Sequence, residues 1–225
     1  MEFRDKKVII FDLDGTLIDS VPDLALAVNF MLTELNHDIF SEDIIREWVG
    51  NGAQTLVKRA LSGCSTISNT LDIQLFDSAL EIFLNFYKNN LSVQTVMYKG
   101  VATTLKKLKE YGYILTIVTN KPYDFVEPIL KGLNINHFFS LTLGADSLKE
   151  KKPSPLPLLH ICEAYNINVS QAIMIGDSKN DIVAANNCNM HSIGVTYGYN
   201  YGESISTYKP TFIVNNFSHI SDILK

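Results

Sequence analysis

Two aspartates, Asp12 and Asp14, stand two residues apart directly after the apolar run 8–11. On extended backbone this spacing points both carboxylates to the same side, while Leu13 between them points away. Two carboxylates so close together repel each other unless a cation or a shared proton offsets their charge. The pair therefore predicts a site that holds a cation or a shared proton, although acidic loop residues that cap a helix have the same pattern.

A second acidic pair, Asp177 and Asp181, follows the apolar run 172–175. Carboxylate oxygens are the ligands that hard cations such as Mg²⁺ prefer, and this pattern predicts part of a metal site. An aspartate that opens the next helix gives the same pattern, and the two roles do not exclude each other.

Neutral and basic polar residues occupy comparable positions elsewhere in the chain. Thr119 and Asn120 close the apolar run 114–118. A hydroxyl, an amide and the N–H groups of a helix start suit phosphate oxygens, but a helix cap explains these residues equally well. Lys152 precedes a proline and can project an ammonium group towards the same place, although a Lys-Pro pair is also typical of a solvated turn.

The elements around these residues predict an α/β fold. Apolar runs typical of buried parallel strands recur along the chain and alternate with helical patterns; the runs are 8–11, 114–118, 138–143, 172–175, 193–196 and 211–214. In a doubly wound, Rossmann-like parallel sheet of this kind, ligands lie beyond the carboxyl ends of the strands. All the polar residues singled out above follow such runs, so we expect them to meet at one edge of the sheet.

One region interrupts the alternation of strands and helices. Residues 17–94 contain amphipathic patterns, such as the stripe that includes Leu24 and Val28, but no strand-like run. We therefore predict an α/β core formed by residues 1–16 and 95–225, with an all-helical insert at 17–94 directly after the first strand.

Composition limits the class of protein. The chain has 225 residues, 46% of them hydrophobic, and a formal net charge of −5, which argues against nucleic-acid or membrane-surface binding. Its three cysteines, Cys64, Cys162 and Cys188, form no CxxC pair. That pattern favours reduced thiols in the cytoplasm over a disulfide framework or a zinc site. The sequence does not distinguish a monomer from a homodimer.

Taken together, these segments resemble the haloacid dehalogenase (HAD) superfamily of phosphohydrolases. The resemblance covers essentially the whole chain, and it rests on four motifs in the order and spacing of that family: Phe-Asp-Leu-Asp-Gly-Thr-Leu at 11–17, Thr119, Lys152, and Gly176-Asp177 with Asp181. The helical insert is similar to the helical cap of that family.

The resemblance implies a role for each of these residues. Asp12 would attack phosphorus and form an aspartyl-phosphate, and Asp14 would protonate the leaving oxygen and then activate water. Mg²⁺ would be bound by the Asp12 side chain, the Asp14 main-chain carbonyl and Asp177, with Asp181 acting directly or through water. The phosphoryl oxygens would be held by a hydroxyl, an amide and an ammonium group: Thr119, Asn120 and Lys152.

The cap carries the information about substrate. Residues 48–53 and 56–61 look like the cap segment of bacterial phosphoglycolate phosphatases, which implies hydrolysis of 2-phosphoglycolate to glycolate and phosphate. Gly52 lies where backbone N–H groups at the start of a helix favour an anion. Arg59 is a candidate for a bidentate contact to the substrate carboxylate, although it fits a solvated helix face equally well and Lys58 is an alternative.

Other functions remain to be separated from this one. A HAD hydrolase or mutase for a sugar phosphate, a pyrophosphate or a nucleotide would keep the core residues and change the cap. A phospho-accepting receiver domain also clusters aspartates, a threonine and a lysine around Mg²⁺, but it is much shorter and has no helical cap. An inactive binding protein on this fold would not be expected to retain Asp12, Asp14, Lys152 and Asp177.

Overall fold

The computed structural model describes residue 3 and residues 5–225, and its centre is a six-stranded sheet. The strand order is β5-β4-β1-β6-β7-β8, and every neighbouring pair is parallel. The strands are β1 (Val8–Phe11), β4 (Ile114–Val118), β5 (Phe139–Leu143), β6 (Ala172–Gly176), β7 (His191–Val195) and β8 (Phe212–Val214). The predicted α/β parallel sheet is confirmed, and β1 lies inside it between β4 and β6.

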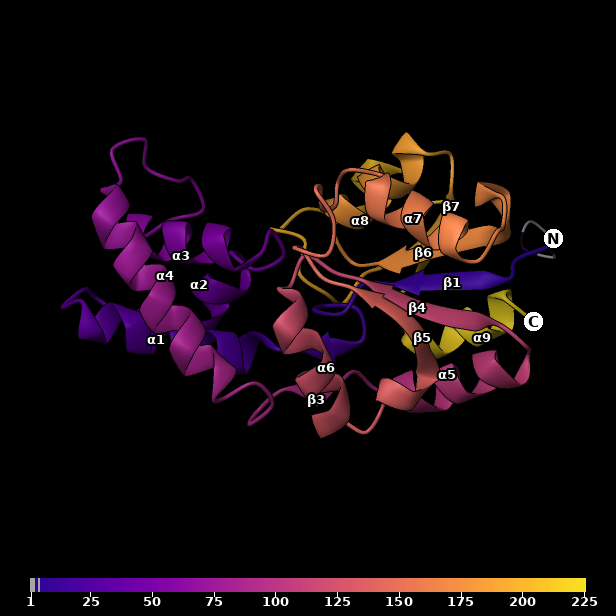
Figure 1. Cartoon of the computed structure of the whole chain (residues 1–225), viewed down its shortest axis with the longest axis horizontal. Coiled ribbons are helices and arrows are strands. Elements are labelled where there is room, and N and C mark those ends of the chain that lie inside the picture. Colours follow the sequence, from indigo (N-terminus) through magenta and orange to yellow (C-terminus); the bar gives the residue numbers. More distant parts are fainter. Residues whose placement is uncertain (1–2, 4) are drawn as a thin grey trace.

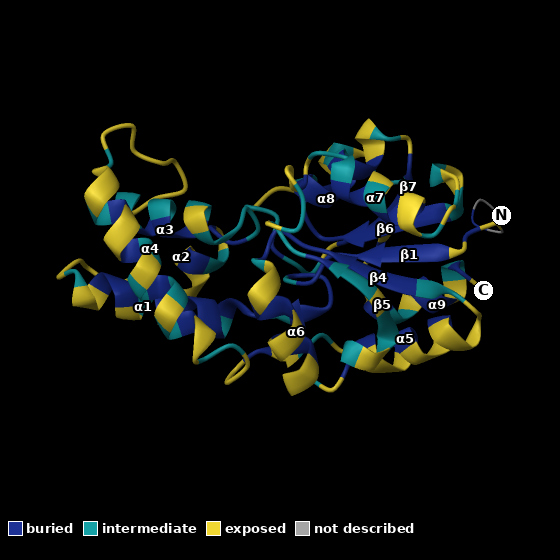
Figure 2. Cartoon of the chain, viewed as in Figure 1, coloured by how far each residue is buried: buried dark blue, intermediate teal, exposed yellow. Residues whose placement is uncertain are grey.

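Helices cover both faces of the sheet (Figure 1). One face carries α5 (Val101–Glu110), α6 (Tyr123–Gly132) and α9 (Ile220–Ile223), and the other carries α7 (Leu156–Ala164) and α8 (Lys179–Asn187). Alternate side chains of β1 enter different cores, because Ile9 and Phe11 pack in one cluster while Val8 and Ile10 pack in the other. The inner strands β1, β4 and β6 are therefore buried on both sides along nearly their whole length (Figure 2), which explains their continuous apolar runs, whereas the edge strands β5 and β8 are more exposed.

Four helices form a separate unit beyond the carboxyl ends of the strands (Figure 1). They are α1 (Val21–Glu34), α2 (Glu42–Arg46), α3 (Ala53–Ser62) and α4 (Ile73–Lys88). Trp48, Phe83 and Tyr87 are nearly fully buried there and belong to the same cluster as one face of the sheet. The short helix α2 ends at Arg46, and turns follow it.

Two very short strands lie at the ends of this helical unit. β2 (Ile18–Asp19) pairs antiparallel with β3 (Val96–Met97). These strands were not predicted, because a run of two residues shows no periodicity. Buried Asp23 strengthens the connection, since its carboxylate accepts hydrogen bonds from the backbone of Gln94 (2.9 Å) and Thr95 (2.9 Å) and from the Thr95 hydroxyl (2.7 Å). The division of the chain at residues 17 and 94 stays a prediction.

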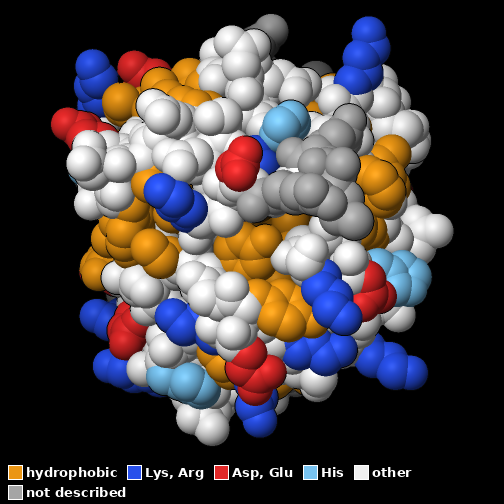
Figure 3. Space-filling model, turned by 90° about the vertical axis from the view of Figure 1, so that its right-hand side faces the viewer, with side chains coloured by type: hydrophobic (Ala, Val, Ile, Leu, Met, Phe, Trp, Pro, Cys, Tyr) orange, Lys and Arg blue, Asp and Glu red, His pale blue; other side chains and the backbone are white. Residues whose placement is uncertain are grey.

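The described residues also form four 3₁₀ helices: η1 (Asn136–Phe138), η2 (Val169–Gln171), η3 (Ile205–Tyr208) and η4 (Phe217–His219). Figure 3 shows the face of the core at the right-hand side of Figure 1, away from the helical unit, where basic, acidic and apolar side chains are interspersed. Within the described part of the chain, every helix is too short or too polar to cross a membrane.

Candidate active site

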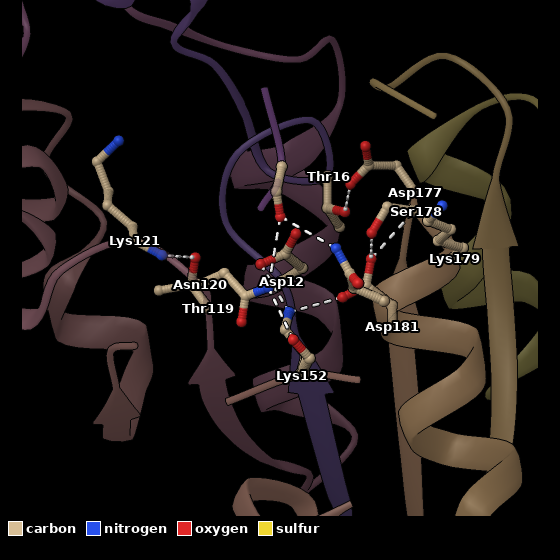
Figure 4. A network of polar contacts seen from close by, with 12 residues as sticks. Asp12, Thr16, Thr119, Asn120, Lys121, Lys152, Asp177, Ser178, Lys179 and Asp181 are labelled. Carbon is tan, nitrogen blue, oxygen red and sulfur yellow. Dashed lines mark hydrogen bonds and ion pairs between the residues drawn. The ribbon is translucent and has the colours of Figure 1, made fainter. Parts of the chain in front are cut away.

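The carboxyl ends of three adjacent strands bring the predicted site residues together. Asp12 follows β1, Thr119 follows β4 and Asp177 follows β6. Asp181 lies in the first turn of α8, and Lys152 lies in the loop between β5 and α7. Figure 4 shows these side chains gathered around Asp12.

Three of the aspartates form a compact, buried cluster. Carboxylate oxygens of Asp12, Asp177 and Asp181 all lie within 4.8 Å of one another. The Lys152 ammonium group lies 2.9 Å from Asp12 Oδ1 and 2.6 Å from Asp181 Oδ1. One ammonium group thus faces three carboxylates, and this balance leaves the cluster short of positive charge.

The electrostatics of the cluster follow from its burial. Burial raises the pKa of Asp12 to about 7; the Lys152 ammonium group opposes this rise, and the carboxylates of Asp181 and Asp14 add to it. Burial, with the charges of Asp12 and Asp181, raises the pKa of Asp177 well above its usual range. Hard oxygen donors with excess negative charge are the donor set that suits a divalent cation, so these residues fit a metal ion.

Neighbouring groups fix the orientation of the cluster. Asp177 accepts hydrogen bonds from the Thr16 hydroxyl (2.7 Å) and from the Tyr199 backbone N–H (2.7 Å). Asp181 Oδ2 accepts from the backbone N–H (3.0 Å) and the hydroxyl (2.9 Å) of Ser178. Gly15 has a φ of +87°, and a Cβ there would overlap the Asp177 carboxylate. Only glycine at that position leaves room for this carboxylate beside the backbone.

Asp14 is separate from the cluster and has its own cation. The Lys121 ammonium group donates to both Asp14 oxygens, at 3.0 and 3.2 Å, and the Ser20 hydroxyl donates to Oδ1 at 2.5 Å. Lys121 is only 5% exposed, and although burial alone lowers the pKa of a lysine, the Asp14 carboxylate raises it above its ordinary value. This role for Lys121 was not predicted, and the one signal for it in the sequence is its position two residues after Thr119, at a strand end.

The predicted phosphate ligands on the loop after β4 are buried at the same edge. The Thr119 hydroxyl accepts a hydrogen bond from the Lys121 backbone N–H at 3.2 Å. The Asn120 side-chain amide donates to the carbonyl of Lys152 (3.0 Å) and to the carbonyl of Gly50 in the helical unit (3.4 Å). The Asn120 side chain therefore ties the core to the helical unit, and its predicted contact with phosphate stays a prediction.

A small cavity of about 40 Å³ lies between the core and the helical unit. Asp12 and Asp14 line it on the core side, with Thr119, Asn120 and Lys121 beside them. The wall on the side of the helical unit is mainly apolar and is formed by Leu24, Val49, Leu56, Phe83 and Tyr87, with the backbone of Gly50 and Gly52. The cavity thus joins a charged end to an apolar end.

Of the residues in the helical unit that were considered as substrate ligands, one lines the cavity and two do not. Gly52 lines the cavity directly before α3. Arg59 is not among the described residues that line it; its guanidinium donates to the Trp48 carbonyl (2.7 Å) and the Ser65 carbonyl (3.0 Å). The Lys58 ammonium group lies over the Phe76 ring, 4.7 Å from its centroid. Neither basic side chain is brought to the cavity.

Comparison with known proteins places this arrangement in a family. The model of the haloacid dehalogenase-like hydrolase family matches residues 9–195. The chain is a haloacid dehalogenase-like hydrolase. The hydrolase is 49% identical over 225 residues to a phosphoglycolate phosphatase of Colwellia psychrerythraea, with all of both chains covered. It is 51% identical over 221 residues to a phosphoglycolate phosphatase of Psychrobacter arcticus, with 98% of this chain and 96% of the relative covered.

Solved structures agree with the fold of the hydrolase. The crystal structure of a predicted phosphoglycolate phosphatase from Haemophilus somnus superposes with a TM-score of 0.91 at 40% identity, covering 98% of this chain and 99% of that one. A putative phosphoglycolate phosphatase from Lactobacillus delbrueckii gives a TM-score of 0.88 at 25% identity, covering 100% and 99%. The family resemblance drawn from the sequence motifs is therefore confirmed.

Proposed function

We propose that this hydrolase is a phosphoglycolate phosphatase that converts 2-phosphoglycolate into glycolate and phosphate with Mg²⁺ as its cofactor. The observation that carries the proposal is the cavity, whose charged end holds Asp12 and Asp14 and whose other end is closed by Leu24, Leu56 and Phe83. Full-length relatives that are named phosphoglycolate phosphatases, at 49% and 51% identity, support the same substrate.

The cavity wall argues for a small substrate. A sugar phosphate would place several hydroxyl groups against apolar side chains, and each buried hydroxyl left without a partner costs about 1–3 kcal/mol. A two-carbon ester has no such groups to satisfy beyond its phosphate and carboxylate. The apolar wall therefore favours phosphoglycolate over sugar phosphates, which are one of the alternatives.

The first chemical step falls to the two aspartates. An Asp12 carboxylate oxygen forms a bond to phosphorus while the bond from phosphorus to the ester oxygen breaks, which gives an aspartyl-phosphate. Asp14 must enter this step carrying a proton, which it donates to the departing glycolate oxygen. In the second step Asp14 accepts a proton from water as the water oxygen bonds to phosphorus, and the Asp12 carboxylate leaves.

Charge balance suggests roles for the remaining residues of the site. Lys152, held between Asp12 and Asp181, neutralises part of the cluster and faces the phosphoryl group once Asp12 carries it. The Asp12 and Asp177 side chains would hold Mg²⁺, with the Asp14 carbonyl as a further ligand and Asp181 as a direct or water-mediated one. When bound, the ion supplies the positive charge that lets anionic phosphate approach the carboxylates.

The test is a screen of the purified protein against small phosphate esters, with free phosphate as the readout and with Mg²⁺ added or chelated. We expect turnover of 2-phosphoglycolate that depends on Mg²⁺ and exceeds that of sugar phosphates, pyrophosphate and nucleotides. The variant Asp12→Asn is the control, because it removes the nucleophile while keeping nearly the same volume. Faster turnover of a sugar phosphate than of 2-phosphoglycolate would contradict the proposed substrate.

A further inference from the structure

Of the described residues that line the cavity, Lys121 is the one cation. Its ammonium group contacts Asp14 at 3.0 and 3.2 Å, and it lies 4.9 Å from the centroid of the Tyr87 ring on α4. An ammonium group has three N–H donors, so at least one remains for another acceptor after both Asp14 oxygens are bound. Asp14 and the aromatic ring of the cap hold that donor in a fixed place.

We propose that Lys121 binds the carboxylate of the substrate and thereby selects phosphoglycolate among small phosphate esters; this inference rests on the proposed function. The ester oxygen that receives the Asp14 proton must lie within hydrogen-bond distance of Asp14. In phosphoglycolate the carboxylate is joined to that oxygen through one methylene group, which places its oxygens roughly 3 Å away. The Lys121 ammonium group lies 3.0 Å from Asp14 Oδ1, a similar distance, so it can reach the substrate carboxylate.

The other basic residues near the site are engaged elsewhere, and one of them, Lys151, donates to the Asn51 carbonyl at 2.9 Å. Lys152 is 2% exposed and lies between Asp12 and Asp181. Arg59 is held by carbonyls of its own helical unit, outside the cavity. A substrate carboxylate that faced the apolar cap wall would lose its hydration without a counter-charge, which is strongly unfavourable. The substrate carboxylate is therefore expected to face the core, where Lys121 contacts Asp14.

The test compares two esters in the Lys121→Met variant. The esters are 2-phosphoglycolate and 2-hydroxyethyl phosphate, which has a hydroxymethyl group in place of the carboxylate. We expect kcat/KM for 2-phosphoglycolate to fall roughly 10- to 100-fold more than kcat/KM for 2-hydroxyethyl phosphate, since a charge-assisted hydrogen bond is lost with the first ester only. An equal fall for both esters would overturn the proposal, because it would mean that Lys121 acts only through Asp14 or the fold.

Partial unfolding does not change the ratio of the kcat/KM values for the two esters, because inactive protein lowers both by the same factor. Lys121→Arg should restore most of the preference for the charged ester, since it keeps the positive charge. Lys58→Met is the matched control on the cap and should leave the ratio of the wild type unchanged. A ratio that changes as much in Lys58→Met as in Lys121→Met would also overturn the assignment.

The wild-type ratio separates this proposal from the function it rests on. If the wild type prefers 2-phosphoglycolate and Lys121→Met keeps that preference, Lys121 is not the carboxylate ligand, although the proposed function stands. If the wild type hydrolyses 2-hydroxyethyl phosphate at least as well as 2-phosphoglycolate, the proposed function fails and the inference fails with it.

Discussion

The close packing of the loop after β7 against Asp177 gives a quantitative prediction for Gly198→Ala. A Cβ at Gly198 would meet the Asp177 Cβ and the Gly15 carbonyl oxygen about 1 Å inside the 3.4 Å at which ordinary contact begins. Neither neighbour is the free end of a flexible side chain. The methyl group therefore displaces Asp177, or it moves the loop whose Tyr199 N–H holds that carboxylate.

The expected effect falls on metal affinity more than on stability. Overpacking of this size costs about 1–3 kcal/mol, and a misplaced metal ligand or orienting group typically costs 10- to 100-fold in affinity. We expect the Mg²⁺ concentration that gives half-maximal phosphatase activity to rise roughly 10- to 100-fold. Calorimetric titration of the metal-free protein with Mg²⁺ should show the same shift without relying on turnover.

Gly202→Ala is the matched control in the same loop. Gly202 has a φ of +73°, and a Cβ there would meet no described atom within 4 Å. The substitution costs about 1–2 kcal/mol of backbone strain and should leave the Mg²⁺ dependence of the wild type in place. If Gly198→Ala binds Mg²⁺ as tightly as Gly202→Ala does, Asp177 is not a metal ligand and the reasoning is refuted.

Three further substitutions test other parts of the structure. Asp14→Asn should cut turnover roughly 10²- to 10⁴-fold while a cooperative unfolding transition persists; near-normal turnover would remove Asp14 as acid and base. Lys152→Met should destabilise the metal-free protein by about 3–5 kcal/mol at pH 8 in urea unfolding. The loss should be smaller at pH 5, because Asp12, with its pKa raised to about 7, is then protonated and leaves less unpaired charge; equal losses would contradict this. Asp23→Ala leaves the Thr95 N–H and hydroxyl without their partner and should lower the unfolding free energy by about 2–4 kcal/mol, against little change for exposed Asp77→Ala.

The sequence by itself determined the type of fold and most of the core site. Runs such as 8–11 and 172–175 are apolar at every position because their strands are buried on both faces. That pattern can be recognised from the sequence alone. The carboxyl ends of parallel strands share one edge, so Asp12, Thr119 and Asp177 had to lie close together. The family motifs then implied a role for each of them.

Only the tertiary structure decided which side chains face the cavity between the core and the cap. Helical periodicity did not distinguish Arg59 from Lys58 as substrate ligands, and the packing of α3 brings neither of them to the cavity. In the sequence, nothing beyond its position at a strand end marked Lys121 as a partner of Asp14. The two residues are 107 positions apart, and only the fold brings the ammonium group to the carboxylate. Contacts of that range depend on how the core and the cap pack together, which no local pattern encodes.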